Sequence, residues 1–325
     1  MAMVSLVTTV RNEERSVVAF VQSLLRQSRP PDEIVVVVGG SSDETVARLA
    51  KLESARREVR VIVVPDSNIS EGRNAGIRLA RHSIIAVTDA GTRADPDWLE
   101  RLVAPLEADE RVAVSSGFFR SGGGTFFERV LSAVVTPLES EIDPDAFLPS
   151  SRSVAFRKEW WARVDGYPEW LQHCEDLVVD LALLREGAHF AFVPDALVEW
   201  SARPNLAAFA RQYYYYARGD GHAGLWPKRH AARYSAYLLG GALVWLWQGR
   251  KRTVCGALLG TGISGYMGKF WRRVASRRPT EGPQLLAAFA VTPVMVAVGD
   301  VAKMGGYAVG LIQRRTVRGA TPKSL

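Results

Sequence analysis

Short apolar runs alternate with helical repeats over the first 116 residues of the chain. The runs predict four buried strands, at residues 4–10, 34–38, 59–64 and 84–88. Between them, apolar residues recur at helical spacing and predict helices near residues 17–25, 43–52, 72–81 and 97–106. This alternation predicts an α/β fold, in which a mostly parallel, Rossmann-like sheet is flanked by helices on both faces.

The pattern becomes less regular after residue 116 and recovers near residue 151. Residues 117–150 contain three consecutive glycines and several prolines, which predict a mobile loop region over the site. A helix is predicted at residues 175–186, with an inward face formed by Leu177, Leu181 and Leu184. A strand near residues 190–193 and a helix over residues 205–218 complete the ordered part.

The sign of the net charge changes after Leu225. The whole chain carries a net charge of +7, with −7 on the first 225 residues and +14 on the last hundred. The basic residues of this tail flank apolar segments, which is typical of contact with membrane lipids and not of nucleic-acid binding. We therefore expect one domain over residues 1–225 and a basic, apolar, helical, membrane-associated region over residues 226–325. The alternative is that the tail is a buried helical core contact of a soluble protein.

The tail contains three apolar segments, at residues 234–248, 253–268 and 285–312. The first two are shorter than the roughly 20 residues that span a bilayer. The loop between them, at 249–252, is basic and would lie outside if both crossed, against the positive-inside rule. We expect a shallow or re-entrant hairpin, with the third segment in the membrane interface. The N-terminus lacks the features of a secretory signal, so we expect the chain to lie at the cytoplasmic face of the cell membrane.

Polar stretches follow three of the predicted strands and should meet in one crevice, because parallel strands end at the same edge of a sheet. Hydroxyls, backbone amides, an arginine and a carboxylate in one crevice suit a phosphorylated ligand. Asp89 has the chemistry to meet a metal ion or a sugar hydroxyl. The candidate donor-binding residues are Thr8, Thr9, Val10, Asn12, Glu13, Gly39, Gly40, Ser41, Arg73, Asn74, Asp89, Ala90 and Gly91.

Some alternatives are excluded by what the sequence lacks. No GxGxxG turn follows a predicted strand, which argues against a dinucleotide site. The chain has only two cysteines, Cys174 and Cys255, so it contains neither a disulfide framework nor a cysteine-rich zinc module.

Two further groups have the chemistry of a transfer reaction. Glu175 and Asp176 begin a predicted helix, where a carboxylate either caps the helix or acts as a general base on an acceptor hydroxyl. The helix near residue 212 is aromatic and cationic, so it either packs on the core or stacks a sugar and binds pyrophosphate. Its candidate acceptor-binding or diphosphate-binding residues are Arg211, Gln212, Tyr216 and Arg218.

The order of these stretches resembles glycosyltransferase family 2, the inverting enzymes with a GT-A fold, over about residues 3–220. The matching stretches are Thr8 to Glu14, Gly40 to Thr45, Gly72 to Gly76, Thr88 to Gly91, Phe156 to Tyr167, Glu175-Asp176 and Gln212 to Arg218. Three positions depart from the family pattern. Val38-Gly39 replaces a pair of acids, Gly91 replaces the second acid of the DxD site, and tyrosines follow Gln212.

The resemblance implies an inverting transfer from a nucleotide-sugar donor to a hydroxyl or phosphate of a lipid-linked or glycan acceptor, in the synthesis of a polysaccharide or cell-envelope glycan. It implies that residues 1–225 form the GT-A catalytic domain, with Asp176 as the base and Glu175 supporting it. Asp89 would then bind Mg²⁺ or Mn²⁺, although the second acid of that site is Gly91. The alternatives are a nucleotidyl-transferring relative and a non-catalytic binder of sugar nucleotides.

Overall fold

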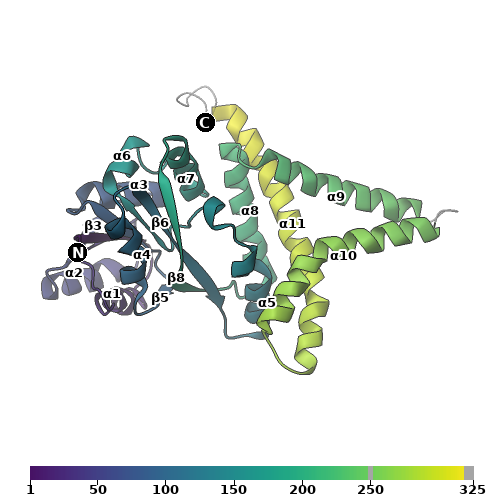
Figure 1. The fold of residues 1–325 in the computed structure, drawn as a ribbon, viewed down its shortest axis with the longest axis horizontal. Coiled ribbons are helices and arrows are strands. Elements are labelled where there is room, and N and C mark those ends of the chain that lie inside the picture. The colour runs from purple at the N-terminus through teal and green to yellow at the C-terminus, as the bar shows by residue number, and fades with distance from the viewer. Residues whose placement is uncertain (248–251, 318–325) are drawn as a thin grey trace. The chain divides into compact units, whose positions relative to one another are not determined.

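The computed structural model describes residues 1–247 and 252–317 (Figure 1). The expected basic residues Arg250, Lys251 and Arg318, and the loop that begins at Gly249, lie outside the described residues. The chain divides into two compact units, each described by itself below. Unit 1 comprises Met1–Ser121 and Glu139–Ser201, and unit 2 comprises Gly122–Leu138 and Ala202–Leu325.

Unit 1 is built on an eight-stranded sheet with the strand order β3-β2-β1-β4-β7-β6-β8-β5. Its first four strands are parallel: β1 (Val4–Val10), β2 (Glu33–Val38), β3 (Val59–Val63) and β4 (Ile84–Val87). The others are β5 (Thr92–Ala94), β6 (Val112–Gly122), β7 (Val154–Arg157) and β8 (His189–Ser201). Antiparallel pairs join β4 to β7, β7 to β6, and β5 to β8, so the sheet is mixed, with the predicted parallel arrangement in its β3-β2-β1-β4 part. The prediction held for the strands that crossover helices connect, which is the connection that parallel pairing needs.

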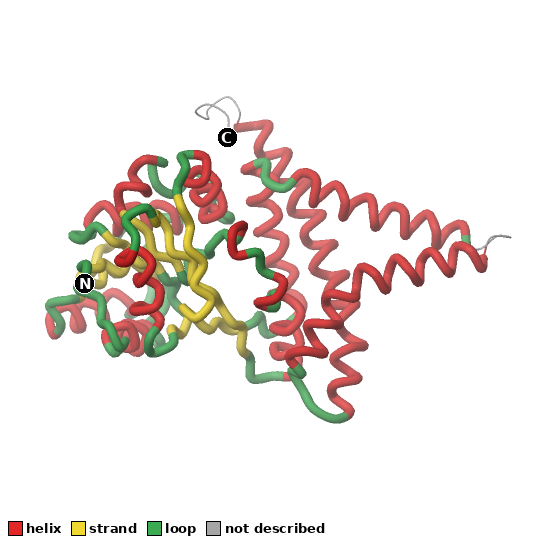
Figure 2. Tube along the Cα trace, in the orientation of Figure 1, coloured by secondary structure: helices red, strands yellow, loops and turns green. Residues whose placement is uncertain are grey.

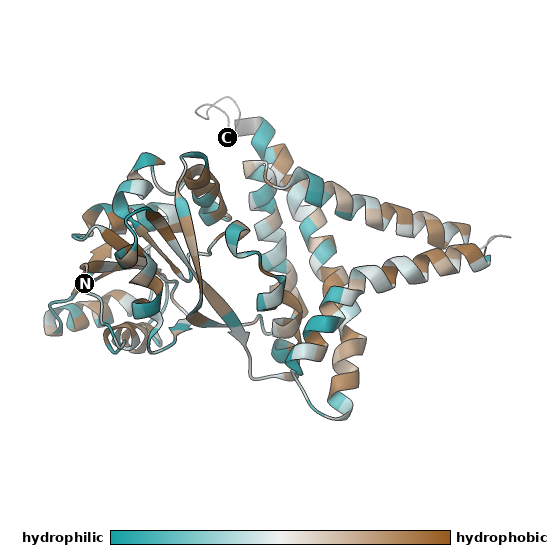
Figure 3. Ribbon diagram, viewed as in Figure 1, coloured by the Kyte–Doolittle hydropathy of each residue, from teal (hydrophilic) through white to brown (hydrophobic). Residues whose placement is uncertain are grey.

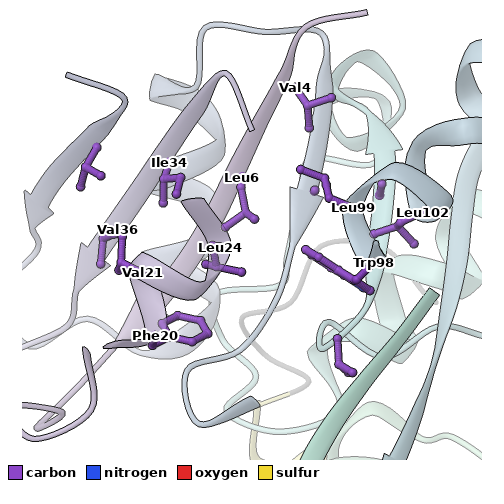
Figure 4. Packing of buried hydrophobic residues seen from close by; sticks show 14 of the residues in the cluster. Val4, Leu6, Phe20, Val21, Leu24, Ile34, Val36, Trp98, Leu99 and Leu102 are labelled. Atoms are coloured by element: carbon purple, nitrogen blue, oxygen red, sulfur yellow. The ribbon is translucent and has the colours of Figure 1, made fainter. Parts of the chain in front are cut away.

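Helices cover both faces of the sheet in unit 1 (Figure 2). One face carries α1 (Val17–Leu25), α2 (Thr45–Ala55) and α4 (Trp98–Ala108), whose buried residues pack on Leu6 and Ile34 (Figure 4). The other face carries α3 (Ile69–Leu79), α6 (Lys158–Arg163) and α7 (Glu175–Arg185), which pack on Val7 and Val35. Adjacent strand residues thus enter opposite cores, which explains the near-continuous apolar runs.

The buried face of α7 differs from the predicted one. The structure buries Val179 and Leu183 and leaves Leu184 44% exposed, whereas Leu184 was expected to point inward. The cause is Glu175, which is itself buried because it pairs with an arginine. Residues 175, 179 and 183 share one side of a helix, so burial of the first sets the phase of the rest.

Residues 117–150 are more regular than the predicted loop region. Strand β6 continues to Gly122, and helix α5 spans Phe126–Val135. Thr125 and Glu128 form a capping box at the start of α5, in which each side chain accepts a hydrogen bond from the other residue's backbone N–H. Short 3-10 turns at Glu139–Glu141 and Pro144–Ala146 follow. The local capping signal therefore outweighed the glycines and prolines around it.

Unit 2 is helical and contains, besides α5, helices α8 (Leu206–Ala223), α9 (Pro227–Leu246), α10 (Arg252–Arg277) and α11 (Pro283–Val317). Helix α8 lies along α11 at very close range, because glycines face it. A Cβ at Gly306 would lie 2.1 Å from the Tyr214 carbonyl oxygen, and one at Gly310 would lie 2.1 Å from that of Arg218. Unit 1 ends at Ser201 and unit 2 resumes at Ala202. The expected boundary after Leu225 therefore falls inside unit 2.

The helices of unit 2 expose large apolar side chains. Figure 3 shows brown apolar turns in the later part of α9 and the earlier part of α10, with white and teal turns elsewhere on both helices. The exposed residues include Leu238, Leu239, Val244, Trp245, Val254, Leu258 and Ile263. Among the described residues, one helix, Pro283–Arg315, is long and apolar enough to cross a membrane by length and composition. A third of its most apolar stretch is buried within the protein, in contacts with α5 and α8.

Candidate functional site

The loops after β1 and β2 are tied together by hydrogen bonds at the carboxyl end of the sheet. The Asn12 backbone N–H donates to Ser41 Oγ at 2.9 Å, and the Ser42 N–H donates to Asn12 Oδ1 at 2.9 Å. The Glu13 N–H donates to Thr45 Oγ1 at 2.8 Å. Asn12 has a φ of 55°, a backbone conformation that asparagine tolerates better than most residues. The predicted donor-binding residues of these two loops therefore meet, as the parallel strands require.

The two glycines after β2 are needed where they stand. Gly39 donates its N–H to the Val10 carbonyl at 3.1 Å, and a Cβ on it would lie 3.0 Å from Ser67 Oγ. Gly40 has a φ of 69°, in the left-handed region that favours glycine. Thr8 is fully buried in β1.

Helix α3 reaches the end of the sheet because its glycines allow a close approach. A Cβ at Gly76 would lie 2.7 Å from Val7 Cγ1, and one at Gly72 would lie 3.1 Å from Thr9 Cγ2. The residue that follows Gly72, Arg73, is thereby pressed between the sheet and α7. Glycine thus determines the position of the arginine, which the sequence alone did not show.

Arg73 joins two of the predicted site elements. Its guanidinium lies 2.7 Å from Asp89 Oδ1 through Nη2 and 2.5 Å from Glu175 Oε1 through Nη1. The arginine side chain is only 2% exposed. Burial is the largest influence on its pKa and acts to lower it, but Asp89 and then Glu175 outweigh burial, so the pKa is raised. Arg73 is therefore a permanent cation that joins the turn after β4 to α7, and each of its two terminal nitrogens has a carboxylate partner.

Asn74 serves a different purpose from the predicted one. It is buried, and its Nδ2 donates to the Tyr167 carbonyl at 2.8 Å and to Glu169 Oε1 at 2.9 Å. Its Oδ1 accepts the Tyr167 N–H at 2.8 Å. Asn74 thus fixes the segment before α7, and its buried amide finds its partners within the protein.

Asp89 lies in the turn between β4 and β5. Its carbonyl accepts a hydrogen bond from Thr92 Oγ1 at 2.7 Å, and Gly91 in this turn has a φ of 81°. Arg73 holds one carboxylate oxygen of Asp89, and the side chain remains 28% exposed. A Cβ at Gly91 would meet no described atom within 4 Å, so the absence of a second acid there leaves open space.

The turn that contains Asp89 can offer a divalent cation a single carboxylate. Within residues 1–247 and 252–317, no three His, Cys, Asp or Glu side chains come together as a metal site. Asp89 can supply one carboxylate oxygen, and Mg²⁺ is commonly held by one or two carboxylates together with substrate phosphates and water. The residues therefore fit a metal that arrives with a diphosphate.

The two carboxylates at the start of α7 have different environments. Glu175 is buried, and burial raises its pKa to about 7 although Arg73 acts to lower it. Asp176 is half-buried, and its Oδ1 accepts the Leu177 N–H at 2.9 Å. Glu175 is locked against Arg73, which leaves Asp176 as the carboxylate with freedom to meet a substrate.

Asp180 is a site-proximal acid that the sequence interpretation missed. Asp180 is 5% exposed. It lines the same small cavity as Asp176, which lies one turn before it on α7. Burial, and then the charge of Asp176, raise the pKa of Asp180 well above its ordinary value. The signal in the sequence was an acid four residues after Asp176, which places both carboxylates on one side of the helix.

The four candidate residues near position 212 lie on α8, in unit 2, whereas all the other candidates lie in unit 1. Gln212 Nε2 donates to the Tyr216 hydroxyl at 2.7 Å. The guanidinium of Arg218 lies 4.9 Å from the Tyr215 ring. Arg211 shares this helix with them, so the four form a cationic and aromatic set within α8.

These features define the class of the protein. The parallel strands with interlocked end loops, followed by the Asp89 turn and the α7 carboxylates, form a GT-A glycosyltransferase domain. The sequence model described as "Glycosyl transferase family 2" matches residues 5–169, half of the chain. The chain belongs to glycosyl transferase family 2, as its motifs predicted.

Two known proteins resemble the chain in sequence. An uncharacterized glycosyltransferase of Bacillus subtilis, EpsJ, is 25% identical over 215 residues, which cover 62% of this chain and 62% of that protein. A glucosyl-dolichyl phosphate glucuronosyltransferase of Haloferax volcanii is 32% identical over 91 residues, 27% of this chain and 28% of its own length. The chain thus spans less than two thirds of the length of either relative.

A solved structure matches nearly the whole chain. It is the mannosyltransferase PcManGT from Pyrobaculum calidifontis in complex with GDP-Man and Mn²⁺. The TM-score is 0.52 at 16% identity, and the match covers 98% of this chain and 87% of that one. This likeness confirms the GT-A fold that the sequence resemblance implied.

Proposed function

We propose that the protein is an inverting glycosyltransferase that moves a sugar from a nucleotide-sugar donor to a hydroxyl of a lipid-linked acceptor. The observation that carries the proposal is the Arg73 bridge, which holds Asp89 and Glu175 at one end of the sheet. A metal-compatible carboxylate, Asp89, and the neighbour of the candidate base, Glu175, are thereby fixed on opposite sides of one buried cation. The name of the Haloferax relative, a transferase on a dolichyl phosphate sugar, supports the lipid-linked acceptor.

The reaction follows from the chemistry of the side chains. Asp176 accepts the proton of the acceptor hydroxyl as its oxygen forms a bond to the anomeric carbon. The bond from that carbon to the donor diphosphate breaks, the configuration inverts, and a nucleoside diphosphate leaves. The backbone N–H groups near Gly40 and Ser41 bind the donor. A divalent cation on Asp89, when bound, neutralises charge on the diphosphate.

A thermal-shift screen of nucleotide sugars, with and without Mn²⁺, tests donor binding. We expect one donor to raise the melting temperature, because a ligand at 100 times its dissociation constant stabilises the folded state by about 2.7 kcal/mol. That donor should then release nucleoside diphosphate in the presence of a lipid-linked acceptor. Release of pyrophosphate would instead indicate nucleotidyl transfer, and binding without turnover across several acceptors would indicate a non-catalytic binder.

We propose further that unit 2 holds the enzyme at the cytoplasmic face of the cell membrane. Support comes from the exposed apolar residues of α9 and α10, and from the length of the apolar helix Pro283–Arg315. The exposed arginine in the last turn of α11, Arg315, suits anionic headgroups.

The expected result of a flotation assay is that the full chain rises with vesicles that contain anionic lipid. Replacement of Leu238, Leu239 and Trp245 by glutamine should weaken flotation, because these residues on α9 are 66–74% exposed. Val63→Gln is the matched control, since Val63 is an exposed apolar residue of unit 1. Recovery of the unmodified chain in the soluble fraction without detergent would contradict the proposal. Protease digestion of unit 1 in everted vesicles, but not in right-side-out ones, is the expected sign of the cytoplasmic face.

A further inference from the structure

A small, partly enclosed space adjoins the candidate base in unit 1. Its volume is about 10 Å³, which is close to the room that a single water molecule needs. The polar residues that line it are Asp176 and Asp180 of α7, Ser151, and Tyr167. The rest of the lining is largely apolar, so a molecule held there would be sheltered from bulk solvent.

Asp180 brings an unsatisfied oxygen to this space. The side chain is 5% exposed, and its Oδ2 has no hydrogen-bond partner within the described part of the chain. A buried polar atom without a partner is costly, and buried waters commonly satisfy such groups. The cavity therefore combines the size for one water with a group that requires one.

We propose that Asp180 is a positioning residue for the candidate base: in its protonated form it holds one water in this cavity and, through that water, orients the carboxylate of Asp176. The inference rests on the proposed function for the role of Asp176. The Asp180 hydroxyl donates to the water, and the water donates to an oxygen of Asp176. The charge on Asp176 is thereby stabilised, as a base must be ionised before it can accept a proton.

The surroundings favour the neutral form of Asp180. Burial and the charge of Asp176 both raise its pKa. From the segment before α7, Tyr167 faces the same cavity, and burial raises the pKa of its phenol, which stays protonated. Arg73 of α3 lies 5.3 Å from the Tyr167 ring and is paired with Glu175 and Asp89, so its charge is already balanced.

Two substitutions of similar size distinguish the loss of the hydrogen-bond donor at residue 180 from a change in side-chain volume. Asp180→Asn retains an N–H donor toward the water, whereas Asp180→Leu removes it and suits the apolar lining. Titration of carboxyl-carbon NMR signals in the full chain, assigned by loss of the signal in Asp176→Asn, reports the Asp176 pKa without any substrate. We expect that pKa to be similar in the wild type and Asp180→Asn, and about one unit higher in Asp180→Leu, a tenfold change in proton affinity.

A second measurement checks the protonation of Asp180 through stability. A carboxyl whose pKa is raised by folding stabilises the protein below its unfolded pKa, and this contribution is lost as the pH rises through the folded pKa. Asp180→Asn has no such loss, so its stability relative to the wild type should increase as the pH rises above about 4. The same Asp176 pKa in all three proteins, or an Asp180 signal that titrates in the ordinary range, would overturn the inference.

The titration separates this inference from the proposed function. Suppose that glycosyl transfer occurs, and that Asp180→Leu moves the acid limb of the pH profile of kcat/KM to higher pH while Asp180→Asn does not. The inference and the proposed function are then both supported. If transfer occurs and neither the limb nor the Asp176 pKa moves, the role of Asp180 is wrong and the enzyme remains. If no donor is turned over but the Asp176 pKa still depends on residue 180, the coupling is correct and the proposed activity is wrong.

Discussion

Asp176→Asn is expected to lower turnover by roughly 10²–10⁴-fold, the usual contribution of a general base, while donor affinity stays near that of the wild type. The amide has the same shape as the carboxylate but cannot accept the proton of the acceptor hydroxyl. Asp176 is half-buried and, within the described part of the chain, is not one of the ion-pair partners of Arg73, so the fold should tolerate the change. Single-turnover kinetics with the donor found by thermal shift, together with a donor titration, would measure both quantities.

Two further variants make this result specific. Asp195→Asn changes an exposed carboxylate of unit 1 and should leave turnover unchanged. Glu175→Gln removes a buried partner of Arg73 and should cost stability as well as turnover. Donor binding that disappears in Asp176→Asn while the fold is retained would assign the residue a structural role, and turnover at the wild-type rate would rule it out as the base.

Much of the fold was predictable where a residue's neighbours in sequence decide its environment. The runs at 4–10 and 34–38 are apolar at every step because Leu6 and Val7 enter different cores, and such runs predict central parallel strands. The prediction of a loop over helix α5 is wrong although the capping box of the helix is local, because the glycines before it favour a loop. The membership of α8 in unit 2 was not predictable, since it depends on glycines of α11 about 90 residues later.

The location of the candidate site at the ends of the parallel strands was predictable. The role of each side chain within it was less so. Topology brings Asn12, Ser41 and Asp89 to one edge of the sheet wherever the strands are parallel. Whether an arginine faces a ligand or a carboxylate depends on packing that sequence does not show, and Arg73 proved to be buried between two acids. Asn74 and Asp180 likewise took their roles from burial, one with every partner satisfied and one with a partner missing.

Replacement of Arg73 by methionine should destabilise unit 1 by roughly 3–5 kcal/mol, the usual cost when one partner of a buried ion pair is removed. Arg73 is 2% exposed and Glu175 is 8% exposed, so the lost cation would leave a carboxylate in a site that water barely reaches. Urea unfolding of the detergent-solubilised chain, followed by amide exchange in β1 and β4, would measure the loss within unit 1.

Arg93→Met supplies the comparison, because Arg93 pairs with Glu199 at 2.9 Å but is 73% exposed, and exposed pairs contribute about 0–1 kcal/mol. The double variant Arg73→Met with Glu175→Gln should recover part of the loss, since it removes the buried charge together with its partner. Equal stability of Arg73→Met and Arg93→Met would show that the buried bridge does not hold β4 to α7. In that event Asp89 and Asp176 would be positioned by their own loops, and Arg73 would be available for a diphosphate, as the sequence suggested.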